Sequence, residues 1–144
     1  MKKLFLFVAV AALTLSCSKD DDAQADSIKF KINGTQTTMT NINVDESEEG
    51  EDTYLTVVGS VGGQTDARIM SFTVYQGDTG ADAIEGFNYS TMSPSGFYMS
   101  NGSFASDVDT NSSSRLKGTF SGTMTSLGGG EPLTITDGSF NVSH

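Results

Sequence analysis

The chain has 144 residues, a net charge of −10 and only 8 Lys and Arg residues. This acidic balance argues against nucleic-acid binding, which depends on clusters of basic side chains. With a single cysteine, the chain has no partner for an intramolecular disulfide and no cysteine-based metal site.

The first segment, residues 1–16, has the organisation of a secretory signal peptide. Lys2 and Lys3 are followed by an apolar run over residues 4–15 and then by a small residue, Ser16. As a helix, this run spans about 18 Å, whereas the hydrocarbon core of a bilayer is ~30 Å thick. The pattern therefore predicts a cleaved signal peptide rather than a membrane span.

Cys17 lies at the expected cleavage position and is the predicted site of lipidation. Residues 13–17 read Leu-Thr-Leu-Ser-Cys and resemble a bacterial lipobox, although Thr14 stands where leucine is commonest. The resemblance implies that the Cys17 thiol carries a diacylglycerol and that Cys17 becomes the first mature residue. Acyl chains contribute about 0.8 kcal/mol per buried methylene, so two or more of them hold a protein on a membrane without a transmembrane helix.

Acidic residues follow the cysteine closely: Ser18 and Lys19 come first, and Asp20, Asp21 and Asp22 come directly after them. This arrangement resembles the export signal of Bacteroidota surface lipoproteins and implies an outer-membrane protein exposed at the cell surface. The alternative interpretation is an ordinary solvated linker. Residues 17–27 have no apolar period and predict a flexible tether. The expected organisation is a signal peptide (1–16), a lipidated acidic tether (17–27) and a single domain (28–144).

The domain carries the two-residue hydrophobic period of β-strands. Ile28, Phe30 and Ile32 alternate with lysines, and Asn33-Gly34 predicts a tight hairpin turn. Further strands are expected over residues 35–40, 53–60, 68–76, 87–91, 97–104, 115–125 and 132–143.

The acidic run 45–52 and the polar stretches 77–86 and 107–114 are expected to be loops. No segment has a sustained period of 3.6 residues, so the predicted fold is an all-β antiparallel sandwich, with a small β-barrel as the alternative.

Glycines in the last two strands carry specific expectations. Gly118 and Gly122 share the inward face with Leu116, Phe120 and Met124. They are predicted to leave room for rings on the neighbouring strand or to mark bulges. The sequence Asp137-Gly138 predicts a bulge that shifts the register of the last strand.

Two stretches extend the resemblance beyond the lipidation signal. The chain opens its domain with Phe30-Lys31-Ile32-Asn33-Gly34 and closes it with hairpin patterns over residues 116–120 and 133–142. These patterns resemble small uncharacterised surface lipoproteins of Bacteroidota. The resemblance implies an all-β lipoprotein and indicates no ligand.

The sequence contains no strong catalytic constellation. His144, the only histidine, is the last residue, where we expect it to be frayed and solvated. A serine nucleophile with a histidine base, or a histidine zinc site, is therefore not expected. Most carboxylates lie in expected loops rather than among apolar residues, and we predict that the protein is not an enzyme.

A weak calcium site is a candidate at Asp107, Asp109 and Asn111. These residues place oxygen ligands at alternate positions, as in an EF-hand loop. Ser112 stands at the glycine position and Gly118 at the glutamate position, so the match is partial. The run 45–52 is a second candidate, and a polar turn and a solvated acidic loop are the simpler interpretations. Beyond the covalent lipid on Cys17, no other cofactor is expected.

Tyr89 and Tyr98, with Phe87, are expected to be exposed and are candidates for glycan binding by ring stacking. The alternative is that they pack at an edge of the sheet. The resulting hypothesis is a non-enzymatic surface lipoprotein that is held on the membrane by its lipid and binds a protein partner or supports an assembly. Alternatives are a carbohydrate-binding component of a glycan-uptake system and a calcium-dependent adhesin-like module.

Overall fold

The computed structural model describes residues 25–144, and all regular elements in this part are strands. They are β1 (Ser27–Ile32), β2 (Thr35–Met39), β3 (Asn41–Glu49), β4 (Asp52–Val61), β5 (Arg68–Tyr75), β6 (Gly80–Ala81), β7 (Ile84–Met92), β8 (Ser95–Ser100), β9 (Ala105–Asn111), β10 (Arg115–Ser126) and β11 (Leu133–Ser143). The predicted all-β fold is confirmed.

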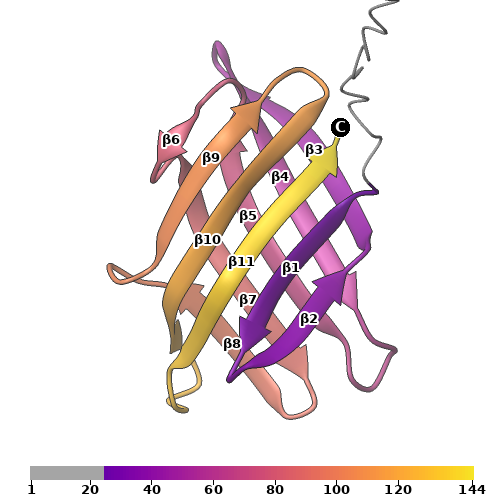
Figure 1. Cartoon of the computed structure of the whole chain (residues 1–144), viewed down its shortest axis with the longest axis vertical. Coiled ribbons are helices and arrows are strands. Elements are labelled where there is room, and N and C mark those ends of the chain that lie inside the picture. The colour runs from indigo at the N-terminus through magenta and orange to yellow at the C-terminus, as the bar shows by residue number, and fades with distance from the viewer. Residues whose placement is uncertain (1–24) are drawn as a thin grey trace, which may run out of the picture.

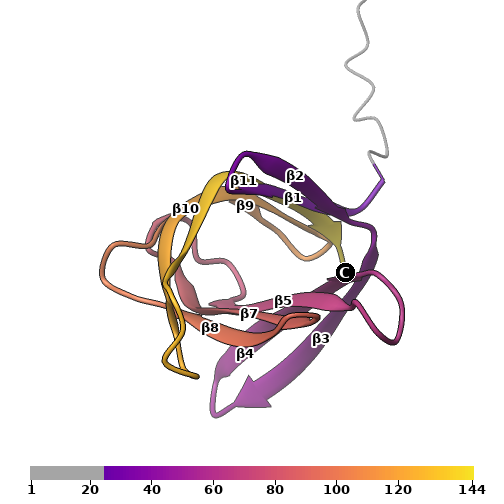
Figure 2. The same ribbon diagram turned by 90° about the horizontal axis from the view of Figure 1, so that it is seen from below.

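The strands form one continuous antiparallel sheet that curls into a half-barrel (Figures 1 and 2). Its order is β2-β1-β11-β10-β8-β7-β5-β4-β3, and β9 pairs with both β10 and β6. The two edge strands, β2 and β3, are separated in the chain by Thr40 alone. One bent segment therefore supplies both edges of the curled sheet. Of the two expected architectures, this curled single sheet lies closer to the barrel than to two separate stacked sheets.

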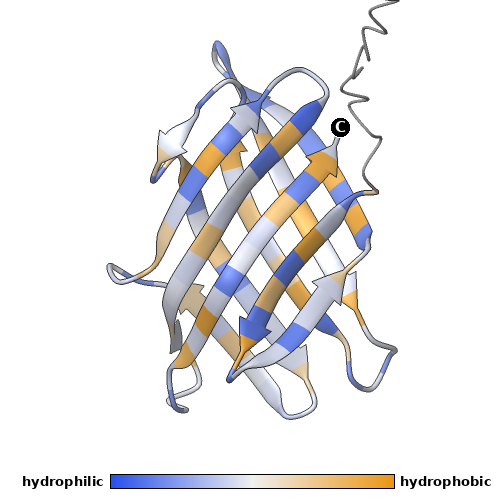
Figure 3. Cartoon of the chain, in the orientation of Figure 1, coloured by the Kyte–Doolittle hydropathy of each residue, from blue (hydrophilic) through white to orange (hydrophobic). Residues whose placement is uncertain are grey.

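The core fills the inside of the curl with side chains from alternate positions, as the banding along each strand shows (Figure 3). Its centre is a cluster of phenylalanines, each at most 3% exposed. The ring of Phe72 lies 4.8 Å from that of Phe87 and 5.0 Å from that of Phe140, and Phe87 lies 4.9 Å from Phe120. Rings at these separations add to the free energy of burying apolar surface.

Local turn chemistry follows the sequence predictions. Asn33 and Gly34 have φ values of 51° and 79°, and Ile32 pairs with Thr35 across the turn. Positive φ at both central residues gives a hairpin the twist that its strands require. The register of β11 shifts around Asp137-Gly138, since Lys29 pairs with Ser139 but Lys31 pairs with Thr136. Both the predicted turn and the predicted bulge are confirmed.

The glycines of β10, the longest strand, act as expected. A Cβ on Gly118 would lie 2.3 Å from the backbone oxygen of Asp107 and 2.5 Å from Phe140 Cζ. Gly122 has a φ of 140° and follows a register shift between β10 and β11. Gly118 therefore makes room for a ring, and Gly122 marks an irregularity of the ladder.

Two loop predictions and one edge-strand prediction are wrong because strand pairing decided the conformation. The acidic run belongs to the β3–β4 hairpin, in which Asp45 pairs with Thr56 and Glu49 with Asp52. β3 is an edge strand, where charged side chains remain solvated and discourage pairing with other chains. Residues 105–111, expected to be partly loop, form β9 on β10. β7, expected to be a short edge strand, lies between β5 and β8.

The half-barrel has two distinct ends. Ser27, at the start of β1, pairs with Asn141 near the end of β11, so the beginning of the folded part and the C-terminus share one end (Figure 1). We call it the clasp end, after the contacts of Asp26 described below. The β1–β2, β7–β8 and β10–β11 turns lie at the other end, called the far end.

Candidate functional site

The predicted lipidation and export residues lie outside the described part of the chain. They are Cys17, Ser18, Lys19, Asp20, Asp21 and Asp22. Lipidation and export therefore stay predictions. Between residues 25 and 144 there is no helix with the length and apolar character needed to cross a membrane.

The expected exposure of the candidate tyrosines is wrong. Tyr89 is 2% exposed, and its ring lies edge-on to Phe30 at 5.7 Å, inside the curl. Burial raises the pKa of Tyr89, an effect that the nearby Arg68 partly opposes. Tyr98 pairs in register with Tyr89 and is half-buried against the core, and Phe87 is 2% exposed. These rings pack the interior because β7 is a central strand.

The calcium candidates lie on a strand rather than a loop. Asp107 and Asp109 are exposed at alternate positions of β9, where they cannot curl around one ion as loop ligands do. The Asn111 amide instead donates to the backbone oxygens of Tyr75, at 2.7 Å, and Asp78, at 2.9 Å. Within residues 25–144, no three His, Cys, Asp or Glu side chains are grouped to hold a metal.

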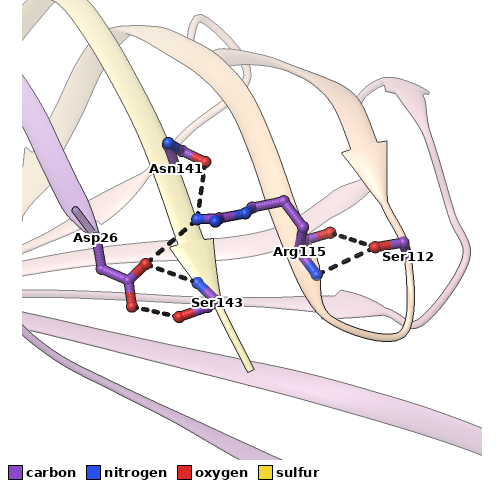
Figure 4. Close-up of polar contacts among 5 residues, drawn as sticks. All are labelled: Asp26, Ser112, Arg115, Asn141 and Ser143. Carbon is purple, nitrogen blue, oxygen red and sulfur yellow. Dashed lines mark hydrogen bonds and ion pairs between the residues drawn. The ribbon is translucent and has the colours of Figure 1, made fainter. Parts of the chain in front are cut away.

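Asp26 forms a polar clasp between the beginning and the end of the domain (Figure 4). Its Oδ1 accepts hydrogen bonds from the Ser143 backbone N–H, at 3.0 Å, and from Arg115 Nη1, at 3.3 Å. Its Oδ2 accepts one from the Ser143 hydroxyl at 2.7 Å. Arg115 also donates to Asn141 Oδ1 at 3.3 Å. The folded part thus includes Asp26 and Ser27, which the sequence assigned to the tether.

His144 is buried, which corrects the prediction of a solvated end. Its side chain is 1% exposed, and Nδ1 lies 2.9 Å from Oε1 of Glu46 on β3. The contact joins the residue after β11 to β3, the edge strand at the other end of the strand order. The alternation along β11 is the signal that could have found it, because Val142 and His144 share the inward parity.

An outward-facing tyrosine pair also lies at the clasp end. Tyr54 on β4 donates a hydrogen bond to the hydroxyl of Tyr75 on β5 at 2.8 Å, and the ring centroids are 4.3 Å apart. This hydrogen bond, together with the nearby Glu49 carboxylate, raises the pKa of Tyr54. The pair is an in-register cross-strand contact that helps to hold β4 on β5.

The most distinctive surface lies at the far end and is an apolar patch. The large apolar side chains of residues 25–144 that remain exposed all belong to it, and they are Ile69, Met92, Phe97, Met99 and Leu127. They come from β5, β7, β8 and the turn after β10, which are neighbours in the sheet. Exposed apolar side chains gathered in one area mark interaction sites far more often than scattered ones.

The patch surrounds a hollow of about 550 Å³. Ile69 pairs with Ser90, and Ser90 pairs with Phe97, so a small side chain separates two large ones across three strands. Met92 and Leu127, which are 57% and 60% exposed, line the same hollow. No charged side chain lines it, in a chain of net charge −10. The hollow therefore suits an uncharged, mostly apolar occupant.

Sequence reasoning missed this patch for a specific reason. Residues 97–99 read Phe-Tyr-Met, so both faces of β8 are apolar and the alternation does not say which one faces inward. A depression of about 500 Å³ over β9, β10 and β11 is lined mainly by small side chains such as Ala105 and Ser121, with Asp107 and Asp137 among them. It offers fewer large side chains than the patch.

Comparison with known proteins finds no family model, curated protein or solved structure that matches the chain.

Proposed function

We propose that the chain is a lipid-anchored protein of the bacterial outer membrane, exposed at the cell surface, whose β-domain is a non-enzymatic binding or assembly module. The signal pattern of residues 1–16, Cys17 at the cleavage position and the acidic residues after it support the anchor and its export. An anchor on the N-terminal side places the clasp end of the domain toward the membrane.

The observation that carries the binding role is the position of the apolar patch. The chain enters the fold at Asp26, at the clasp end, whereas Phe97 and Leu127 lie at the far end. A domain tethered at Cys17 therefore presents its uncharged apolar surface away from the membrane. Such a surface stays exposed only at a cost in solubility, which a binding partner removes.

The anchor is tested by replacing the sulfur. Full-length wild type, Cys17→Ala and the matched control Ser18→Ala are expressed in the bacterium that makes the protein, and the cells are fractionated. Wild type and Ser18→Ala are expected in the envelope fraction, and Cys17→Ala in the soluble fraction, because the acyl chains are the main membrane contact. Equal sedimentation of Cys17→Ala and wild type would contradict the proposal.

Surface exposure is tested separately on intact cells. Wild type is expected to be degraded by added protease, whereas a variant with Asp20, Asp21 and Asp22 all replaced by Ala is expected to be protected while remaining in the envelope. Protection of wild type would place the domain on the inner side of the outer membrane.

A second candidate function is binding of a neutral glycan. Phe97 is 45% exposed in an uncharged hollow that Ser90, Thr91 and Ser95 also line, which offers a ring for stacking beside hydroxyl groups. Wild type and Phe97→Ala are compared on a glycan array. Binding that is lost in Phe97→Ala supports this function, and no binding by wild type removes it.

A further inference from the structure

We propose that the edge of β2 receives an extended, acidic segment of a partner protein, which pairs with β2 as one further strand of the sheet. The inference depends neither on the lipid anchor nor on the apolar patch, since β2 is not a neighbour of β5, β7 or β8 in the sheet. Three observations select this occupant: backbone groups that point away from the sheet, a small polar hollow beside them, and basic side chains on both sides of the edge.

The backbone of β2 has hydrogen-bonding groups that the sheet does not use. Ile32 and Thr35 flank a two-residue turn, so they exchange hydrogen bonds between β1 and β2, and this pattern repeats at every second residue. The N–H and C=O groups of Gln36 and Thr38 therefore point away from β1, toward the side on which β2 has no neighbour in the sheet of residues 25–144. These groups recur every ~6.6 Å. An extended polypeptide offers donors and acceptors at the same spacing, whereas a phosphate offers only acceptors.

The two edges of the sheet are protected differently. On β3, four carboxylates lie between residues 45 and 49, whereas β2 reads Thr-Gln-Thr-Thr-Met and contains no charge, no proline and no bulge. Charges, prolines and bulges are the usual means of blocking an exposed edge. The Gln36 side chain bends back over β1, where its Nε2 donates to the backbone oxygen of Phe30 at 3.0 Å. The free side of β2 is therefore accessible to another strand.

A polar hollow of about 210 Å³ lies beside this edge. One wall belongs to β2, and the other comes from the end of β4, the turn after it and the start of β5; the lining residues are Gln36, Thr37, Thr38, Val61, Gly62, Asp66 and Arg68. Small-molecule pockets begin at about 300 Å³, so this hollow has the size for a side chain of a bound segment rather than for a whole ligand. When a strand is added to a sheet, its backbone supplies affinity and such hollows supply specificity.

The charges around β2 select an acidic segment. Three of the five Lys and Arg residues between 25 and 144 lie here. Lys29 and Lys31 are directly opposite the two free residues of β2, and Arg68 lines the hollow. Of the nearby carboxylates, Asp137 pairs with Lys31 at 2.9 Å, and Asp66 lies in the hollow. Three positive and two negative side chains leave a net charge of +1 around β2, in a chain whose net charge is −10.

The free cations are close enough to act on an added strand. Among residues 25–144, neither Lys29 nor Arg68 takes part in an ion pair. A strand added to β2 lies two strand spacings from β1, or about 9.6 Å, which is close to one Debye length at physiological salt. Carboxylates on that strand therefore remain attracted to Lys29, and one that enters the hollow meets Arg68. Acidic side chains in the added segment are favoured over basic ones.

Labelled peptides and the purified full-length chain test the pairing by fluorescence polarisation. The probe is a short peptide of alternating valine and glutamate, and its matched control has glutamine in place of glutamate. The glutamate peptide is expected to bind, and the glutamine peptide to bind more weakly. Two further glutamate peptides are N-methylated on alternate amides, one on each of the two sets. Only one of them should lose binding, because alternate amides of an added strand face β2 and solvent.

Substitutions in the chain locate the binding at β2. Arg68→Gln and the control Lys117→Gln, on the exposed face of β10, remove the same charge. Arg68→Gln should weaken binding of the glutamate peptide about twofold to fivefold, as expected for one exposed ion pair, and Lys117→Gln should leave it unchanged. Thr38→Pro removes a free N–H and places a ring where the added strand would lie, so binding should be abolished. Its Tm should stay near that of wild type, because proline is tolerated where an edge N–H faces solvent.

Each result decides the proposal. No binding of the glutamate peptide, or equal binding of the glutamate and glutamine peptides, overturns the acidic partner. Binding of both N-methylated peptides overturns strand addition, and this test still decides if Thr38→Pro fails to fold, since it leaves the protein unchanged. Self-association in sedimentation velocity that the glutamate peptide reverses would make β3 of another copy the acidic strand and overturn the assignment to a different protein. None of these measurements uses the envelope fraction, so failure of the anchor is detected separately.

Discussion

Replacing Gly118 with alanine tests the packing on which the curled sheet depends. The added Cβ would lie 2.3 Å from the backbone oxygen of Asp107 on β9 and 2.5 Å from Phe140 Cζ on β11. Both distances are far below the ~3.5 Å at which non-bonded heavy atoms attract. The first contact is with backbone, so relief requires β9 to move away from β10, with which it is paired at Gly118 and Val108.

The size of the effect follows from two opposing terms. Forcing an extra carbon into a packed site costs about 1–3 kcal/mol, whereas alanine is favoured over glycine within a strand by about 0.5–1 kcal/mol. We expect a net loss of about 1–2 kcal/mol, or roughly 4–8 °C in Tm for a domain of this size. Urea and thermal unfolding of the purified chain measure both quantities.

Gly102→Ala is the matched control for this experiment. Nothing lies within 4 Å of the Cβ position at Gly102, which is exposed in the turn before β9. This variant should be as stable as wild type or slightly more stable. If Gly118→Ala unfolds at the same denaturant concentration as Gly102→Ala, the close approach of β9 and Phe140 to β10 is incorrect.

Four further results are expected. Asp26→Ala should lower the free energy of unfolding by about 1–2 kcal/mol, since the hydrogen bonds of its partly exposed carboxylate are lost. Amide hydrogen exchange should become faster at the start of β1 and the end of β11, but not in β4. Unchanged exchange at the start of β1 and the end of β11 would contradict the clasp. Replacing Asp45 and Glu48 with threonine should promote aggregation, measured by light scattering, because the exposed edge of β3 loses two of its negative charges while Glu46 keeps its contact with His144; a fully soluble variant would count against this role. Stability should fall above pH 10, since the buried Tyr89 keeps its proton in the folded state after tyrosine in the unfolded chain has lost its own. In denaturation curves measured at pH 8–11, Tyr89→Phe should make this fall in stability less steep. The same dependence of stability on pH in Tyr89→Phe and wild type would refute the effect of burial. Millimolar calcium should leave the melting temperature unchanged, because Asp107 lies on an extended strand; a rise in wild type that is lost in Asp107→Asn would restore the calcium site.

The candidate sites differ in how far they could be predicted. The two-residue period that sets Leu55 and Val57 on one face of a strand, and Met70 and Phe72 on one face of the next, correctly identified core-facing residues and an antiparallel pair. The expected sugar-binding role of Tyr89 rested on its exposure, which the central position of β7 removes. The pattern of apolar residues alone cannot tell a central strand from an edge strand.

Contacts between distant segments were out of reach for the same reason. Asp26 and Ser143 are 117 residues apart, and Glu46 and His144 are 98 apart. Neither pair has a local sequence signature. The Asp26 contact exists only once β1 has paired with β11, and the Glu46 contact only once the sheet has curled and brought the edge strand β3 to the end of β11. The loop prediction for the acidic run was wrong on similar grounds, since pairing with β4 outweighed the weak strand preference of its carboxylates.

The sequence by itself determined the class of the fold, the Asn33-Gly34 turn, the bulge at Asp137-Gly138 and the inward glycine at position 118. These depend on a two-residue period and on the backbone freedom of glycine, which are local properties. Only the tertiary structure decided that Phe97 and Met99 face outward while Tyr98 faces inward, since the pairing of β8 with β7 selects one of two apolar faces. That choice, made by strand register rather than composition, gives the far end its apolar patch.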